Sequence, residues 1–172
     1  NLKPEYYQEF ANYLVDVCKF YKDNHNITFK TLDPFSEPVT NYWGANGGQE
    51  GCHFSTTAQI DFLKVLSPVL IQSGLQTVIS TADETSVAQQ VTDFKSYVSS
   101  NILNLIGQIN THTYTADNMS RANLRSISTF YNKPLWMSEV GMGGSGISGN
   151  LSLAQKLMND IHYIRPEAWV DW

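Results

Sequence analysis

The sequence predicts an α/β fold of the (β/α)8 TIM-barrel type, an incomplete barrel in which this chain covers about strands 4 to 8. Helix-like and strand-like segments alternate along the chain, which indicates a parallel sheet with right-handed crossovers. The turn at residues 33–38 lacks the glycines that cradle a phosphate in a doubly wound sheet. A closed eight-stranded barrel takes about 250 residues, and this chain has 172. We therefore expect residues 1–172 to form part of one barrel domain.

The first helix and the first strand are expected before residue 33. Residues 5–24 repeat apolar side chains at three- and four-residue spacings, the pattern of an amphipathic helix. Ile27–Leu32 is short and β-branched, and Asp33-Pro34 ends it, so this segment predicts a strand. Residues 33–54 are rich in glycine, asparagine and aromatic residues and predict a long loop.

A second helix and strand are expected before residue 81. Ser55 can cap a helix that runs toward Gly74, and Pro68 is expected to bend or break that helix. Leu75–Ser80 is an apolar run that predicts the second strand. The same alternation continues to the end of the chain. The later helices are expected at residues 87–99, 119–131 and 152–164, and the later strands at residues 108–113, 135–138 and 168–172.

Charge and hydropathy exclude several classes of function. The net charge is −5 and no run of lysine or arginine is present, so no nucleic acid is expected as a partner. The longest apolar run, Val65–Ile71, is far shorter than the roughly 20 residues of a membrane span. The histidines at positions 25, 53, 112 and 162 are scattered without ligand spacing, so no metal and no cofactor are expected. Aromatic residues reach 12% and charged residues only 16%, a balance that suits a neutral, sugar-like ligand.

The two cysteines and three asparagine triplets bear on the cellular compartment. Cys18 lies on the apolar face of the first helix, as a small buried residue does, whereas Cys52 lies in the glycine-rich loop. A disulfide between them is an open alternative, because the sequence does not supply the geometry of a bridge. Asn26, Asn118 and Asn150 each begin a triplet that permits N-glycosylation in a eukaryotic secretory route. We expect a secreted protein.

Polar side chains follow the C-terminal end of each expected strand, where barrel enzymes keep their active sites. These side chains are Glu37, Asp83, Glu84, His112, Tyr114, Glu139 and Trp172. Glu37 precedes a proline, which keeps its backbone extended. Glu139 follows a buried strand, where a carboxylate is costly unless it is hydrogen-bonded or functional. Either glutamate alone is equally consistent with a surface loop acid, but together they predict a catalytic pair of carboxylates.

An ordered set of motifs resembles a known family. They are Phe35-Ser36-Glu37-Pro38, Tyr42-Trp43-Gly44, Gly48-Gln49-Glu50-Gly51-Cys52-His53-Phe54, Thr81-Ala82-Asp83-Glu84-Thr85, Asn110-Thr111-His112-Thr113-Tyr114, Trp136-Met137-Ser138-Glu139-Val140-Gly141 and Trp169-Val170-Asp171-Trp172. In this order they resemble the strand ends of glycoside hydrolase family 30, in particular its endo-β-1,6-galactanase branch. The resemblance covers nearly the whole chain.

The resemblance implies a retaining O-glycosyl hydrolase that cleaves β-1,6-galactan, as in arabinogalactan side chains, by double displacement. Glu37 then matches the acid/base and Glu139 the nucleophile. The chain departs from the pattern at Ser36, where hydrolases of this clan usually carry an asparagine that bonds the sugar 2-hydroxyl. The family also appends a β-sandwich, and neither that module nor strands one to three is recognised in this sequence.

Further residues are expected to bind substrate: Ser36, Trp43, Asn46, Glu84, His112, Tyr114 and Trp172. By resemblance Tyr114 bonds Glu139 and His112 meets the substrate, although one of them can instead be a buried polar residue. Glu84, with its neighbour Asp83, can equally cap the helix that begins near residue 86. Trp172 can stack on a sugar or fill the core, and the loop that holds Trp43 and Asn46 can shape a subsite or simply pack on itself.

Two alternatives to a galactanase are kept. One is another family 30 activity, such as a xylanase or a glucosylceramidase-like hydrolase. The other is a carbohydrate-binding, catalytically silent barrel fragment, because a part-barrel leaves open sheet edges. In every case the expected partner is a polysaccharide, and the remaining barrel strands or another chain are expected to cover the edges at Ile27–Leu32 and Ala168–Trp172.

Overall fold

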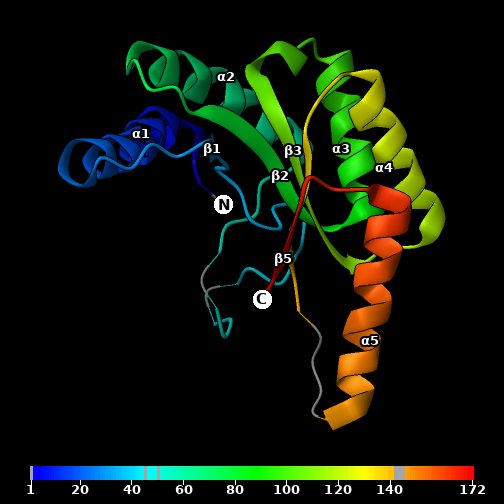
Figure 1. Ribbon diagram of the computed structural model, residues 1–172. Helices are drawn as coiled ribbons and strands as arrows, with labels where there is room; N and C mark the ends of the chain where they lie inside the picture. Colours follow the sequence, from blue (N-terminus) through cyan, green and yellow to red (C-terminus); the bar gives the residue numbers. More distant parts are fainter. Residues whose placement is uncertain (1, 45, 50, 142–145) are drawn as a thin grey trace.

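The computed structural model describes residues 2–44, 46–49, 51–141 and 146–172. Five parallel strands form one sheet in the order β1-β2-β3-β4-β5. The strands are β1 (Thr31–Leu32), β2 (Val78–Ser86), β3 (Ile106–Thr115), β4 (Leu135–Val140) and β5 (Ala168–Asp171). The sheet curls into half of a barrel with helices between successive strands (Figure 1). The predicted incomplete barrel is therefore confirmed.

One helix precedes β1 and the others connect successive strands, as the alternation predicts. They are α1 (Tyr7–His25), α2 (Thr56–Gln72), α3 (Val87–Ser99), α4 (Asn118–Phe130) and α5 (Gly146–Asn159), with short turns η1 (Pro4–Tyr6) and η2 (Leu103–Leu105) and a π-helical turn η3 (Asp160–Ile164). The Ser55 hydroxyl accepts a hydrogen bond from the Ala58 amide and caps α2 as expected. Asp117 caps α4 in the same way, through the Ser120 amide at 2.7 Å.

The structure differs from the sequence prediction in the bounds of several elements. The second strand is Val78–Ser86 rather than Leu75–Ser80, because the polar residues after Ser80 continue along the sheet. The helix α2 runs through Pro68 without the break that was considered, since its apolar face is buried on both sides of the proline. The first strand is only Thr31–Leu32, and α5 begins six residues earlier than expected, at Gly146.

The core lies between the sheet and its helices. Phe62, Leu63 and Leu66 of α2 and Phe94 of α3 are fully buried, and they belong to the same apolar cluster as Ile109 of β3. Such burial contributes roughly 1.5–3 kcal/mol for each large apolar side chain. It is the main term that holds the helices against the sheet.

An aromatic cluster extends this core under the long loop. Phe35, Phe54 and Phe62 lie with ring centroids 5.0 to 6.0 Å apart, and Tyr7 of α1 meets Phe62 edge-on at 5.4 Å. Phe35 stands two residues before Glu37. The burial of Phe35 therefore anchors the loop segment that carries Glu37, the predicted acid/base.

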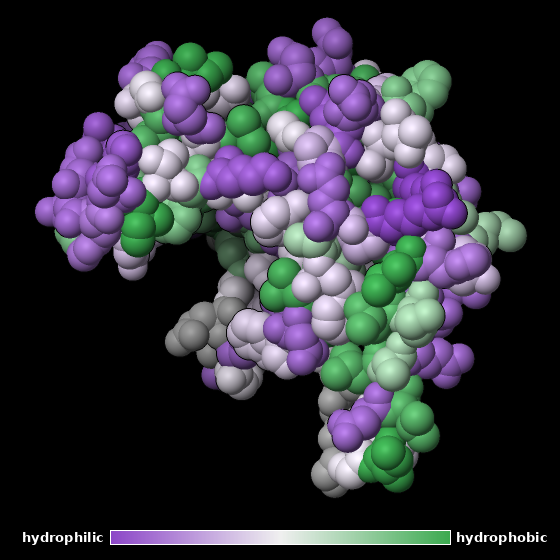
Figure 2. All heavy atoms as spheres, viewed as in Figure 1, coloured by the Kyte–Doolittle hydropathy of each residue, from purple (hydrophilic) through white to green (hydrophobic). Residues whose placement is uncertain are grey.

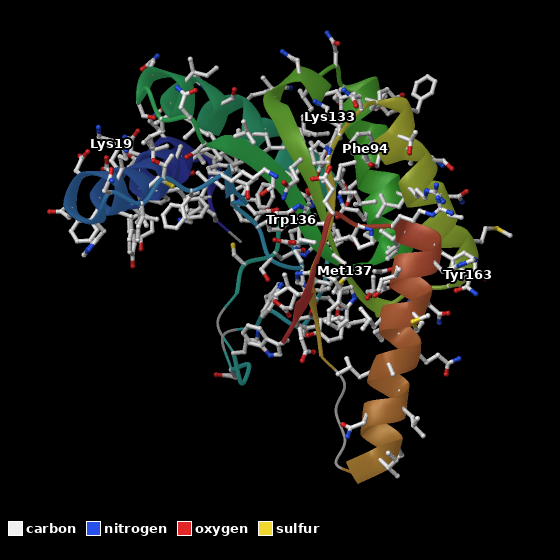
Figure 3. The ribbon with its side chains drawn as sticks, in the orientation of Figure 1. Lys19, Phe94, Lys133, Trp136, Met137 and Tyr163 are labelled. Atoms are coloured by element: carbon white, nitrogen blue, oxygen red, sulfur yellow. The ribbon has the colours of Figure 1, made fainter. Side chains whose placement is uncertain are left out.

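Successive side chains of β4 point to opposite faces of the sheet, and Trp136 and Met137, which are labelled in Figure 3, are one such pair. Met137 is fully buried, and its neighbour Trp136 points to the opposite face of the strand, where Lys30 lies 5.3 Å from the ring centroid. The face of β4 that carries Trp136 also carries Ser138.

The outer strands β1 and β5 are the edges of the sheet. Among the described residues, β1 pairs only with β2 and β5 pairs only with β4. The prediction that these two strands are edges of an open barrel is confirmed. No helix in the described part of the chain is long and apolar enough to span a membrane.

Candidate active site

Glu37 is held in place by its own backbone and by its neighbours. Its φ of 48° lies in the left-handed region, so the extended backbone expected before Pro38 is wrong at this residue. The Glu37 amide donates to the Asp83 carbonyl at 2.8 Å. Its own carbonyl accepts the Thr40 hydroxyl at 2.6 Å and the Trp43 ring nitrogen at 2.9 Å. These bonds offset the cost of the unusual φ and direct the carboxyl group toward His112.

Glu139 comes from the end of β4 and meets Glu37 at the mouth of the half-barrel. One ligand-type atom from each of Glu37, His112 and Glu139 lies within 4.8 Å of the others, so the two carboxyl groups approach to that distance. The Tyr114 hydroxyl donates to Glu139 Oε1 at 3.0 Å. Partial burial and the adjacent Glu139 carboxylate raise the pKa of Tyr114 to about 12, so the phenol stays a donor.

His112 lies buried between the carboxyl groups. Its Nδ1 is 3.0 Å from Glu37 Oε1 and 3.9 Å from Glu139 Oε1, and its Nε2 is 3.6 Å from Asp83 Oδ1. Burial lowers the pKa of His112, but the bonds to Asp83 and Glu37 and the charges of Asp83 and Glu139 outweigh it and raise this pKa to about 9. The imidazole therefore carries a positive charge at neutral pH.

The same three side chains are arranged closely enough to surround a cation. Sequence spacing gave no sign of this, because the residues converge only in the fold. An imidazolium has a proton on both nitrogens and therefore offers no lone pair to a metal. The charged His112 can itself balance an adjacent carboxylate.

A cleft of about 370 Å³ opens in front of the two glutamates. Of the residues predicted from the sequence, five line it: Ser36, Glu37, Tyr114, Glu139 and Trp172. Ser36 and Trp172 are exposed, with Trp172 at 83%, so both are accessible to a ligand. Three further residues, Tyr42, Gln49 and Thr85, line the cleft and were not selected from the sequence. Their positions in motifs beside Trp43 and Glu84 were the available signal.

The remaining predicted residues lie outside the cleft wall. Trp43 supports Glu37 from behind, and Gly51 packs so closely on its ring that a Cβ there would lie 2.1 Å from a ring carbon. Asn46 is exposed in the loop. His112 lies beneath the glutamates and is 2% exposed.

The side chain of Glu84, also a predicted substrate ligand, is buried away from the cleft. It is 1% exposed, and its Oε1 accepts a bond from Gln59 of α2 at 3.3 Å. Burial and the neighbouring Asp93 carboxyl of α3 raise the pKa of Glu84 to about 9. Asp83 and Glu84 have different partners, His112 for Asp83 and Gln59 for Glu84, and sequence alone did not show which of the two lies beside the catalytic glutamates.

Comparison with known proteins assigns the chain to a family. The family model described as O-Glycosyl hydrolase family 30 matches residues 1–137. The chain belongs to glycoside hydrolase family 30. An endo-β-1,6-galactanase from Hypocrea rufa is 33% identical over 172 residues, covering 100% of this chain and 35% of that protein. An exo-β-1,6-galactobiohydrolase from Bifidobacterium longum is 24% identical, covering 96% of this chain and 14% of that protein.

Solved structures of family 30 share the fold. A subfamily 8 xylanase from Clostridium acetobutylicum superposes with a TM-score of 0.81 at 19% identity, covering 100% of this chain and 41% of that one. An endo-β-1,6-glucanase superposes with a TM-score of 0.81 at 23% identity, covering 100% of this chain and 38% of that one. The chain thus spans about a third or less of the length of the curated relatives it matches, and about two fifths of these structures.

Proposed function

We propose that this chain carries the catalytic carboxylates of a retaining glycoside hydrolase that cleaves β-1,6-linked galactan. The observation that carries the proposal is the approach of Glu37 and Glu139 to within 4.8 Å at the C-terminal end of a parallel sheet. A retaining pair stands about 5–5.5 Å apart, whereas an inverting pair leaves about 6.5–9.5 Å for a water. The observed approach favours retention.

The two glutamates divide the reaction into two displacements. In the first, the Glu139 carboxylate attacks the anomeric carbon while protonated Glu37 gives its proton to the departing glycosidic oxygen. In the second, Glu37 takes a proton from water, whose oxygen attacks the same carbon and releases Glu139. The Tyr114 hydroxyl keeps one oxygen of Glu139 fixed so that the other faces the cleft.

The substrate proposal rests on the two curated relatives. Both are named for β-1,6-galactose linkages, one as an endo-acting and the other as an exo-acting enzyme. The cleft is open, and exposed Trp172 and Tyr42 on its wall offer aromatic faces for sugar rings. Degradation of a polysaccharide outside the cell is part of the same proposal.

Product analysis tests the function. We expect the protein to release reducing sugar from β-1,6-galactan and not from xylan, with β-anomers appearing first in the proton NMR spectrum. An α-anomer as first product would overturn the retaining mechanism. Release of reducing sugar from xylan alone would contradict the galactan proposal and favour a xylanase activity, the one named for the Clostridium acetobutylicum structure.

A second candidate is carbohydrate binding without turnover. It is favoured by the open edges at β1 and β5, because the active site of a barrel enzyme is built on a closed sheet. Isothermal titration with a β-1,6-galacto-oligosaccharide separates the two functions, because binding with no product after long incubation supports only the second.

A further inference from the structure

Asp83 connects the elements that carry both catalytic glutamates. It lies in β2, and its backbone carbonyl accepts the Glu37 amide at 2.8 Å. Its carboxylate accepts the hydroxyl of Ser138, the residue that directly precedes Glu139, and lies 3.6 Å from His112 Nε2. A single side chain therefore contacts the acid/base turn, the nucleophile strand and the histidine between them.

The backbone of β2 is shaped to present this side chain. Asp83 has a φ of 53°, a conformation that costs free energy in any residue except glycine. The pairing register with β3 shifts at this point, between Ala82 and Glu84. The Gln90 side-chain oxygen accepts the amides of Ala82 and Glu84 on either side, at 3.3 and 3.4 Å. These contacts hold Asp83 in a conformation that directs its carboxylate toward His112 rather than along the strand.

Carboxyl groups approach His112 from several elements. Glu37 comes from the loop after β1, Asp83 from β2 and Glu139 from β4. The Tyr114 ring, with its centroid at 6.0 Å, faces it from β3 itself. Asp33 lies beside Asp83, and desolvation together with the adjacent Asp83 carboxyl group raises the pKa of Asp33 well above its ordinary value.

We propose that Asp83 is a positioning residue, which holds the His112 ring between Glu37 and Glu139 and thereby sets the spacing of the two glutamates. It does not line the cleft, so it acts through His112 and Ser138 rather than on the sugar. The catalytic consequence rests on the proposed function. The effect of Asp83 on the charge and position of His112 is independent of the proposed function.

The variant Asp83→Asn tests the proposal. Asparagine has the same shape and tolerates a positive φ, so the backbone of β2 is kept and only the charge is lost. We expect the NMR titration midpoint of the His112 ring nitrogens to fall by about one to three pH units, the usual effect of losing one adjacent opposite charge. The matched control is Glu84→Gln, which removes a buried carboxyl next in sequence that faces the helices, and it is expected to leave the His112 midpoint unchanged.

Activity on β-1,6-galactan gives the second readout. In Asp83→Asn we expect kcat to fall about tenfold or more with little change in KM, and the alkaline limit of kcat to move to lower pH. A protein that is inactive from the start overturns the proposed function and leaves the titration to decide on Asp83.

Two results would overturn the proposal for Asp83. One is an unchanged His112 midpoint in a folded Asp83→Asn protein, as judged by circular dichroism. The other result comes from the unmodified protein and is available even if Asp83→Asn does not fold. A His112 ring that carries one proton at pH 7 and titrates at or below its ordinary value of about 6.5 contradicts the role.

Discussion

At the scale of single residues, the candidate site is defined by what touches each carboxylate. Glu139 accepts from Tyr114 at 3.0 Å, and its Oε1 also lies 3.9 Å from His112. Glu37 is 8% exposed, so its outward face is reached only from the cleft. Each glutamate therefore has one oxygen engaged by the protein, which leaves the other for the substrate.

We predict that Glu139→Gln abolishes turnover of β-1,6-galactan while substrate affinity stays nearly unchanged. Glutamine keeps the shape of the side chain and can still accept from Tyr114, but an amide does not attack the anomeric carbon. Rate assays measure turnover and isothermal titration measures substrate affinity on the same preparation. Near-normal turnover in this variant would remove Glu139 from the mechanism.

Ser36 offers a gain-of-function prediction. It is exposed on the wall of the cleft, next to Glu37, so a longer side chain has room there. We expect Ser36→Asn to raise kcat/KM, because an amide reaches the sugar 2-hydroxyl directly and such bonds strengthen in the transition state by several kcal/mol. Ser36→Ala serves as control and is expected to lower it. Equal kcat/KM values for the two variants would show that position 36 does not contact that hydroxyl.

At the scale of elements, the sequence predicted the succession of helices and strands but not the course of β2. The apolar pattern ends at Ser80, and Thr81–Ser86 has the composition of a loop. These residues stay in the sheet because partners far away in sequence satisfy them, such as Ser138 for Asp83 and Gln59 for Glu84. Sequence periodicity contains no information on such tertiary partners, so it did not show that Asp83 contacts His112 whereas Glu84 is buried against α2.

The structure also decides whether Cys18 and Cys52 form a disulfide, which the sequence left open because it does not give the relative position of helix α1 and the loop. Cys18 is buried on the core side of α1 and Cys52 is half-buried in the loop, and both are free thiols. Cys52 Sγ accepts the Leu2 amide at 3.1 Å. The interpretation of Cys18 as a small buried residue is confirmed, and no bridge forms between the two.

The junction of β2, α2 and α3 makes stability depend on pH. Glu84 and Asp93 are buried together there, and burial raises the pKa of both, that of Glu84 to about 9. The folded protein therefore holds a proton that the unfolded chain releases above about pH 4.5. The free energy of unfolding should fall as pH rises from about 5 toward 9, by at most about 1.4 kcal/mol per pH unit for this one proton.

We predict that Glu84→Gln flattens this dependence and is more stable than the unmodified protein at pH 8. Glutamine supplies a permanent N–H where the acid needs a proton. Urea unfolding is compared between pH 5 and 6.5, because His112, with its raised pKa, lowers stability only above its unfolded value of about 6.5. The pKa of Asp33 is also raised, so Asp33 contributes to the slope of both proteins, and the difference between the two slopes reports on Glu84. Glu5→Gln, on an exposed turn, is the control and should keep the original slope. An unchanged slope in Glu84→Gln would mean that this carboxyl is ionised in the fold.

At the scale of the whole molecule, apolar surface lies exposed at the open ends of the half-barrel and along α5. Ile147, Leu151 and Met158 are 63–74% exposed, and Figure 2 shows apolar residues gathered at the far end of this helix. On β5 the side chain of Val170 is 41% exposed beside unpaired backbone groups. Exposed sheet edges invite pairing with another strand, and folded proteins usually cover them or protect them with charges.

We predict that residues 1–172 produced alone self-associate through these edges, and that Val170→Lys weakens the association. A lysine on an edge strand disfavours pairing with a second chain because of charge and desolvation. Sedimentation velocity over a wide concentration range should show a shift toward monomer in this variant. Ile71→Lys is the matched control, since it removes an equally exposed apolar side chain, 75% accessible, from helix α2 and not from an edge. Association that responds equally to both variants would place the contact on general apolar surface. A chain that stays monomeric at every concentration would show that five strands are stable without the cover that a closed barrel provides.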